Sequence, residues 1–280
     1  ALLAVIVANS PLNQFYTNFW QTTFTIGFGS GAMTDTLRYW VNDGLMAVFF
    51  FVVGIEIKRE FRKGELRNRS QAVLPVAAAI GGMLLPALIY TAFNFDKPTL
   101  NGWGIPIATD IAFAVGVLAL LGSRVPSFVK IFLLTLAIVD DMLAIIVIGI
   151  FYATTINLLP LLVAVFFLGL TFLTSRLRPN SAVLYIGVAL LLWLAIKSSG
   201  VHASIAGALS GLMAPIAISS GRDYMAERLE KGLLPFSTFF VIPVFVFANA
   251  GVVLSLDWIS NPEVLPIILG IIFGLVFGKA

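Results

Sequence analysis

The chain has 280 residues, of which 59% are hydrophobic and 11% charged, and its mean hydropathy is +1.00. Apolar runs of about 20 residues recur along it, so the composition predicts a helical protein that spans a membrane several times and excludes a soluble two-domain protein. The formal net charge of +3 comes from basic residues in short loops, which argues against a nucleic-acid partner. Without cysteine, disulfides, iron–sulfur clusters and thiolate metal sites are excluded, and the single histidine makes a zinc site unexpected.

The amino-terminal part is expected to hold the end of a first span and then a hairpin. Residues 1–8 are apolar and begin without methionine, and the chain stops inside another apolar run, so we expect the natural protein to continue beyond both ends. Residues 11–35 form a polar and aromatic segment, in which residues 23–31 alternate apolar and small polar side chains before a Gly-Ser-Gly turn. This pattern is typical of a β-hairpin, here on the periplasmic side, and an ordinary loop is the alternative. Because an isolated hairpin is marginally stable, we expect it to pair with a partner subunit or to lie on the membrane surface.

The basic loops predict the topology. Residues 58–69 hold six Lys or Arg in twelve positions, and loops of this kind stay in the cytoplasm. Later basic loops at 123–124, 176–178 and 222–231 fall on every second connection between the expected spans. The alternation is consistent with about ten spans. We therefore expect residues 1–280 to form a single all-α polytopic transmembrane domain, with the lipid bilayer as its surroundings.

The fourth expected span is interrupted. Residues 102–116 place Pro106, Thr109 and Asp110, together with several glycines, where an unbroken apolar helix should be. Proline removes a backbone donor, and irregular backbone at membrane depth is tolerated only where it is buried in protein or lines a watery cavity. The sequence thus predicts a discontinuous helix, in which the carboxylate of Asp110 balances the exposed amides of a half-helix.

Two adjacent carboxylates stand in the middle of the next apolar run. Asp140 and Asp141 are the only ionisable residues between Ile131 and Phe151, so a helix over this run puts both near the bilayer centre. Each charge costs at least about 3 kcal/mol there, and a cost of this size indicates a function. Successive residues of a helix point about 100° apart, so the two aspartates can serve different partners.

One basic residue is a candidate partner for this pair. Lys279 lies about 21 Å of helix into the last apolar run, where a lone ammonium should lose its proton or find a carboxylate. Paired carboxylates with nearby hydroxyl and carbonyl oxygens suit a hard monovalent cation such as Na⁺ or Li⁺. The same carboxylates, buried and close together, can also carry protons. A site with two competing ligands is sufficient for exchange.

Six segments carry a family resemblance: Ala108-Thr109-Asp110 to Pro126, Ala137 to Asp141, Trp40 to Asp43, Val53 to Glu60, Ser199 to Ala203 and Phe247 to Gly251. With these segments the sequence resembles the NhaA-type sodium/proton antiporters of bacterial inner membranes. The resemblance covers essentially the whole chain. The resemblance implies an inverted-repeat antiporter fold with discontinuous helices and about twelve spans in the full protein. In this chain, residues 71–151 would be the first repeat and residues 264–280 the start of the second.

The resemblance also implies roles for particular residues. Asp140 and Asp141 would carry the cation (Na⁺ or Li⁺) and the proton, Lys279 would pair with Asp140, and Thr109 and Asp110 would lie where two broken helices cross. A cytoplasmic pH-sensing cluster would comprise Glu56, Arg59, Glu60 and Glu230. The hairpin would join two copies into a homodimer, and no cofactor is implied. Exchange would be electrogenic and activated at alkaline pH. The chain departs from the family pattern in two respects. The second broken helix would lie beyond Ala280, and relatives can carry histidines where this chain has Lys231 and Leu234.

Two other functions are compatible with buried acids in a membrane. A passive cation channel could use a carboxylate filter, but its acids would form a ring, whereas these are adjacent. An intramembrane aspartyl protease could share a proton between two aspartates, but it normally places them on different helices. We therefore expect a secondary transporter and not an enzyme.

Overall fold

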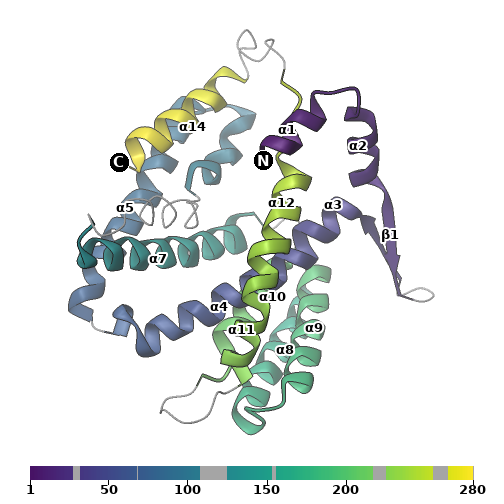
Figure 1. The fold of residues 1–280 in the computed structure, drawn as a ribbon, viewed down its shortest axis with the longest axis vertical. Coiled ribbons are helices and arrows are strands. Elements are labelled where there is room, and N and C mark those ends of the chain that lie inside the picture. The colour runs from purple at the N-terminus through teal and green to yellow at the C-terminus, as the bar shows by residue number, and fades with distance from the viewer. Residues whose placement is uncertain are drawn as a thin grey trace. The chain divides into compact units, whose positions relative to one another are not determined.

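The computed structural model describes residues 1–27, 32–67, 69–107, 125–152, 156–216, 225–254 and 264–279. These residues are mostly helical, with one two-stranded sheet (Figure 1). The chain divides into two compact units. Unit 1 comprises residues 1–58 and 153–254, and unit 2 comprises residues 59–152 and 255–280. We describe each unit separately.

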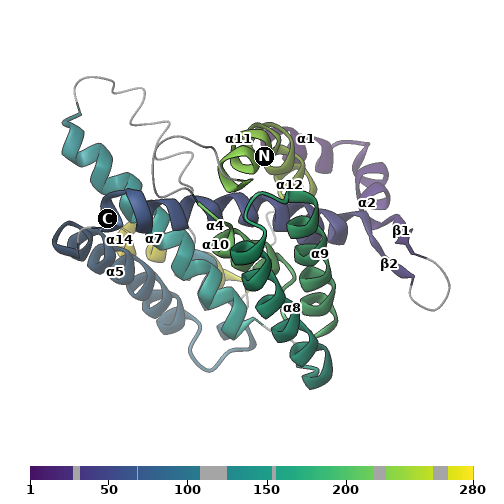
Figure 2. The same ribbon diagram turned by 90° about the horizontal axis from the view of Figure 1, so that it is seen from below.

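The first half of unit 1 contains a hairpin between short and long helices. Its elements are α1 (Leu2–Ala8), α2 (Asn13–Gln21), β1 (Thr23–Ile26), β2 (Met33–Thr36), α3 (Leu37–Tyr39), the π-helical turn η2 (Trp40–Leu45) and α4 (Met46–Lys63), whose last residues belong to unit 2. The expected hairpin is therefore confirmed, and the segment before it, residues 13–21, is a helix. The hairpin projects away from the helices of this unit in both ribbon views (Figures 1 and 2).

The second half of unit 1 is a set of helices that pack on one another. They are α8 (Leu158–Leu177), α9 (Ala182–Ser198), α10 (Ser204–Met213), α11 (Met225–Phe236), the π-helical turn η6 (Ser237–Val241) and α12 (Ile242–Asn249). Helices α8 and α9 lie side by side (Figure 1). Their contact buries Ala164, Leu192, Ala195 and Ile196 with Ala206 of α10.

The contact between α4 and α10 brings two backbones together. A Cβ atom added to Gly207 would lie 2.0 Å from the Ala47 carbonyl oxygen, and one added to Gly211 would lie 2.2 Å from that of Phe51. On the α4 side, Gly54 meets the Ala208 carbonyl in the same way. Small residues at a crossing allow such an approach, which is a common way for membrane helices to pack when they gain little from hydrophobic burial.

Unit 2 holds the interrupted segment and the aspartate helix. Its elements are η3 (Glu65–Arg67), α5 (Arg69–Phe93), the 3₁₀ helix η4 (Pro98–Ile107), α7 (Ser127–Phe151) and α14 (Leu265–Gly278). Helix α14 lies along α5, as Figure 1 shows. The described part of the expected discontinuous helix, up to Ile107, is the tight 3₁₀ form, which leaves backbone groups without α-helical partners.

Several described helices are apolar and long enough to cross a membrane. They cover Leu37–Lys63, Ala72–Phe93, Leu158–Leu177 and Met225–Asn249. Shorter apolar helices, again within the described part of the chain, cover Ala182–Ser198, Ser204–Met213 and Leu265–Gly278. Large apolar side chains are exposed on these helices, among them Leu159, Phe166 and Val183. Lipid is the solvent that makes such exposure favourable, so the chain is a membrane protein.

Candidate functional site

The two adjacent aspartates lie on α7. This helix has 25 residues, and Asp140 and Asp141 follow its midpoint directly. The Asp140 carboxylate is buried, with the residue only 2% exposed, whereas Asp141 is partly exposed. Because neighbours on a helix point in different directions, the pair offers one enclosed and one more accessible acid.

Lys279 meets the buried aspartate. Its ammonium nitrogen lies 3.0 Å from Asp140 Oδ2 and also donates a hydrogen bond to the backbone carbonyl of Ile107. Ile107 ends η4, so one side chain joins α14, the interrupted segment and α7. A buried carboxylate needs a paired charge and hydrogen bonds, and the lysine supplies both.

The packing of α14 on α5 places Lys279. Gly270, Gly274 and Gly278 recur every fourth residue and so share one face of α14. A Cβ atom on Gly278 would lie 2.7 Å from atoms of the Pro86 ring, and one on Gly274 would lie 3.2 Å from Pro106 Cβ. This close approach fixes the register of α14, and Lys279 follows Gly278 directly.

The opposite end of α14 is held by a buried amide. Asn94, which is fully buried, donates 3.0 Å hydrogen bonds to the carbonyls of Tyr90 and Pro266, and its Oδ1 accepts a 2.8 Å bond from the Thr99 hydroxyl. The Tyr90 hydroxyl donates to the Thr99 carbonyl at 2.9 Å. Tyr90 on α5 and Asn94, which directly follows this helix, therefore fasten η4 and α14 to the C-terminal end of α5.

A tyrosine at the end of α7 holds the middle of η4. The Tyr152 hydroxyl accepts a 2.8 Å hydrogen bond from the Gly104 backbone amide and donates a 2.9 Å bond to the Asn101 carbonyl. A Cβ atom on Gly104 would collide with this ring, which explains the glycine. These contacts connect the aspartate helix to the interrupted segment that leads to Ile107.

Other residues expected at the site fall in different places. Thr109 and Asp110 lie outside the described residues. Glu56 and Glu230 belong to unit 1, Glu230 being 7% exposed on α11, and Arg59 and Glu60 belong to unit 2. Glu56 and Glu60 are four residues apart on α4, so they share one face of that helix.

Sequence reasoning missed a polar cluster in unit 1. Asp43 is only 5% exposed, and its Oδ1 lies 3.5 Å from Nδ1 of His202. His202 lies in the connection between α9 and α10, and the hydrogen bond to Asp43 raises the pKa of its imidazole, against burial, which lowers it. Lys197 on α9 forms an ion pair with Asp35 on β2 in the same unit. The signal available in the sequence was the polar and aromatic residues in the two segments that contain Asp43 and His202.

The arrangement in unit 2 can bind a small cation or a proton. Asp140 offers carboxylate oxygens to either, and Lys279 can neutralise the charge when neither is bound. Among the described residues, no three His, Cys, Asp or Glu side chains gather into a cluster that could hold a metal ion.

Comparisons with known proteins identify similar chains. Residues 1–280 match the family model described as Na⁺/H⁺ antiporter 1. The chain is 45% identical over 274 residues to the Na⁺/H⁺ antiporter NhaA 1 of Clostridium beijerinckii, which covers 96% of this chain and 68% of the relative. It is 49% identical over 266 residues to the NhaA antiporter of Nitratiruptor sp., covering 94% and 68%. It is 47% identical over 255 residues to the NhaA antiporter of Shewanella loihica, and this match covers 91% of this chain and 65% of the relative. The chain thus spans about two thirds of the length of these relatives, all of which are named as transporters and not as enzymes.

Proposed function

Because the chain belongs to the Na⁺/H⁺ antiporter 1 family, we propose that the protein exchanges sodium or lithium for protons across a bacterial inner membrane. The observation that carries this proposal is the buried Asp140 carboxylate, 3.0 Å from the Lys279 ammonium in the interior of unit 2. Relatives that match almost the whole chain are named Na⁺/H⁺ antiporters, which supports the same exchange here.

Exchange follows from competition for one site. When Asp140 and Asp141 are protonated they do not attract a cation, and when a cation is bound they cannot hold protons. Two carboxylates can release two protons for one monovalent cation, so exchange would move net charge and be electrogenic. Lys279 contributes by neutralising the charge of Asp140 when neither a cation nor a proton is bound. An inward proton gradient then drives cation export by alternating access.

The remaining elements of this proposal concern the parts around the aspartates. Thr109 and Asp110 would complete the cation site where two broken helices cross. Residues 71–151 and 264–280 would belong to an inverted repeat, within about twelve spans of the full protein. The close packing of α14 on α5 in unit 2 supports a common role for the two stretches.

Regulation and assembly are also proposed. Glu56, Arg59, Glu60 and Glu230 would sense cytoplasmic pH, since all four side chains are ionisable, three in the C-terminal half of α4 and one in the middle of α11. The hairpin of β1 and β2 would join two copies of the chain. Its exposed strand β1 supports this, because an open strand edge is a template for pairing with another strand.

The test is binding and transport with the full-length protein. Sodium and lithium binding would be measured by calorimetry from about pH 6 to 9, and exchange would be measured in proteoliposomes. Asp141→Asn is expected to abolish exchange in a folded, inserted protein, and Asp140→Asn to abolish pH-dependent binding.

The matched control is Asp96→Asn, which makes the same chemical change in the turn between α5 and η4. It should bind and exchange as the unaltered protein does. Retained exchange in Asp141→Asn, or binding that neither pH nor both substitutions affect, would place the cation site elsewhere and leave the aspartates with a structural role.

A further inference from the structure

An aromatic box surrounds one lysine in unit 1. The Lys197 ammonium lies 4.6 Å from the centroid of the Trp40 ring, 4.7 Å from that of Tyr39 and 5.6 Å from that of Trp193. Asp35 supplies the remaining partner, with Oδ2 at 2.5 Å, and the lysine side chain is only 12% exposed. Ring faces carry partial negative charge and attract a cation that lies over them, more strongly when the cation is shielded from water.

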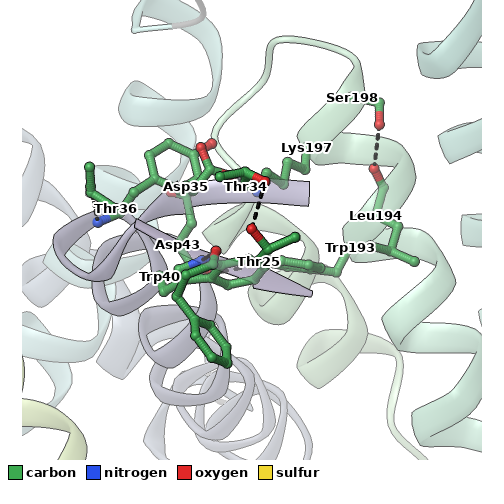
Figure 3. A network of polar contacts seen from close by, with 12 residues as sticks. Thr25, Thr34, Asp35, Thr36, Trp40, Asp43, Trp193, Leu194, Lys197 and Ser198 are labelled. Atoms are coloured by element: carbon green, nitrogen blue, oxygen red, sulfur yellow. Dashed lines mark hydrogen bonds and ion pairs between the residues drawn. The ribbon is translucent and has the colours of Figure 1, made fainter. Parts of the chain in front are cut away.

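The box connects three elements that are distant in sequence. Asp35 lies on β2, the two rings at 39 and 40 follow at the start of the long helical stretch, and Lys197 and Trp193 lie one turn apart on α9. Figure 3 shows the labelled lysine, aspartate and tryptophans grouped together where the hairpin meets α9. The lysine therefore fastens the hairpin to helices of its own chain.

A second contact fixes the other strand. The indole nitrogen of Trp40 donates a 2.9 Å hydrogen bond to the Phe24 carbonyl, and the two rings meet edge to face with their centroids 6.4 Å apart. Phe24 pairs directly with Asp35 across the hairpin, so both lie on the same face of the ribbon. One face of the hairpin is thus attached at both strands.

The opposite face of the hairpin is a ladder of threonines. Thr23 pairs with Thr36 and Thr25 with Thr34, and the hydroxyls of the second pair lie 2.7 Å apart (Figure 3). All residues of β1 are exposed. Because two-stranded hairpins are marginal alone, the direction in which this face points depends on the attachment described above.

We propose that Lys197 is the anchor that orients the hairpin on unit 1 and so determines the surface it offers to a second copy of the chain. The proposal rests on the hairpin-mediated dimer proposed above. The aromatic box makes the anchor selective for a cation, since a carboxylate in the same place would face electron-rich rings. Without the rings, the ion pair would form equally well if the lysine and the aspartate exchanged positions.

The experiment measures the hairpin's orientation by electron paramagnetic resonance. Residues 1–280 contain no cysteine, so Ile26→Cys on β1 and Val183→Cys on α9, both exposed, provide the two labelling sites within them. The full-length protein would be diluted with unlabelled protein so that only distances within one copy contribute. Lys197→Met keeps the length of the side chain and removes the charge, and it should broaden the distance distribution at least twofold. Lys197→Arg should keep it narrow.

Two further variants test the box and the folding. Exchanging the charges, with Lys197→Asp and Asp35→Lys together, should leave the distribution broad, and a narrow one would overturn the role of the rings. Asp35→Asn removes the same ion pair from the exposed side and should also broaden the distribution if Lys197→Met fails to fold. Lys97→Met, at an exposed lysine in unit 2, is the matched control and should change nothing.

A separate measurement of the dimer fraction distinguishes this proposal from the one it rests on. Lys197→Met should weaken dimerisation about tenfold when the dimer is quantified by native mass spectrometry. A narrow distribution in both Lys197→Met and Asp35→Asn would overturn the anchor whatever the dimer does. Broadening in a protein that is monomeric throughout would support the anchor and contradict the hairpin-mediated dimer.

Discussion

The contact between α4 and α10 should be intolerant of a single added methyl group. Gly207→Ala places a Cβ atom 2.0 Å from the Ala47 carbonyl oxygen and 2.8 Å from its carbonyl carbon. Both neighbours are backbone atoms of a helix, which cannot rotate away as a side chain can. The helices must therefore separate by about 1 Å, which loosens the neighbouring contacts of Gly54 and Gly211 because interiors are close-packed.

The size of the effect follows from two opposing contributions. Overpacking of a well-packed interior costs about 1–3 kcal/mol. Alanine is a better helix former than glycine by up to about 1 kcal/mol, which offsets part of the cost. A net loss of about 1–2 kcal/mol corresponds to a fall in Tm of about 2–8 °C for a domain of this size.

The assay is thermal unfolding of the purified protein in detergent, with two matched controls. Gly169→Ala on α8 and Gly187→Ala on α9 make the same change where an added Cβ meets nothing within 4 Å. Their Tm should be unchanged or higher, because only the helix propensity changes. If Gly207→Ala is as stable as these controls, the close contact between the two backbones does not exist and the reasoning is refuted.

Three further predictions concern hydrogen-bonded side chains. Asn94→Leu should lower the unfolding free energy by about 2–4 kcal/mol, because its partners on η4 and α14 lose their hydrogen bonds. Asn101→Leu, at an exposed position on η4, is the control. Equal losses for the two variants in chemical denaturation would contradict the prediction. Tyr152→Phe should cost about 1–3 kcal/mol and increase hydrogen exchange at the Gly104 amide, whereas unchanged exchange would be evidence against this bond. The His202 pKa is raised above its ordinary 6.5, so the stability from the contact with Asp43 is full below that pH and is lost as pH rises through the folded-state pKa. The Tm advantage of the unaltered protein over His202→Gln should accordingly shrink with rising pH, and a constant difference would exclude this linkage.

The sequence by itself determined the class of protein and singled out the candidate residues of its centre. Apolar runs long enough to cross a bilayer require helices, because backbone groups in lipid must bond within their own segment. The same reasoning singled out Asp140 and Asp141, since charges at that depth are costly, and it placed the hairpin through its alternating pattern. Local composition is sufficient for these conclusions because each depends on neighbouring residues alone.

Only the tertiary structure decided which distant residues meet. The carbonyl of Ile107 as a partner of Lys279, the Asn94 amide between η4 and α14, and the box around Lys197 join residues from different helices. In the sequence, Lys197 is an ordinary basic residue at a helix end, and nothing local shows that three rings surround it. The registers of α10 on α4 and of α14 on α5 depend on glycine contacts with the partner helix, and such contacts are properties of two surfaces together.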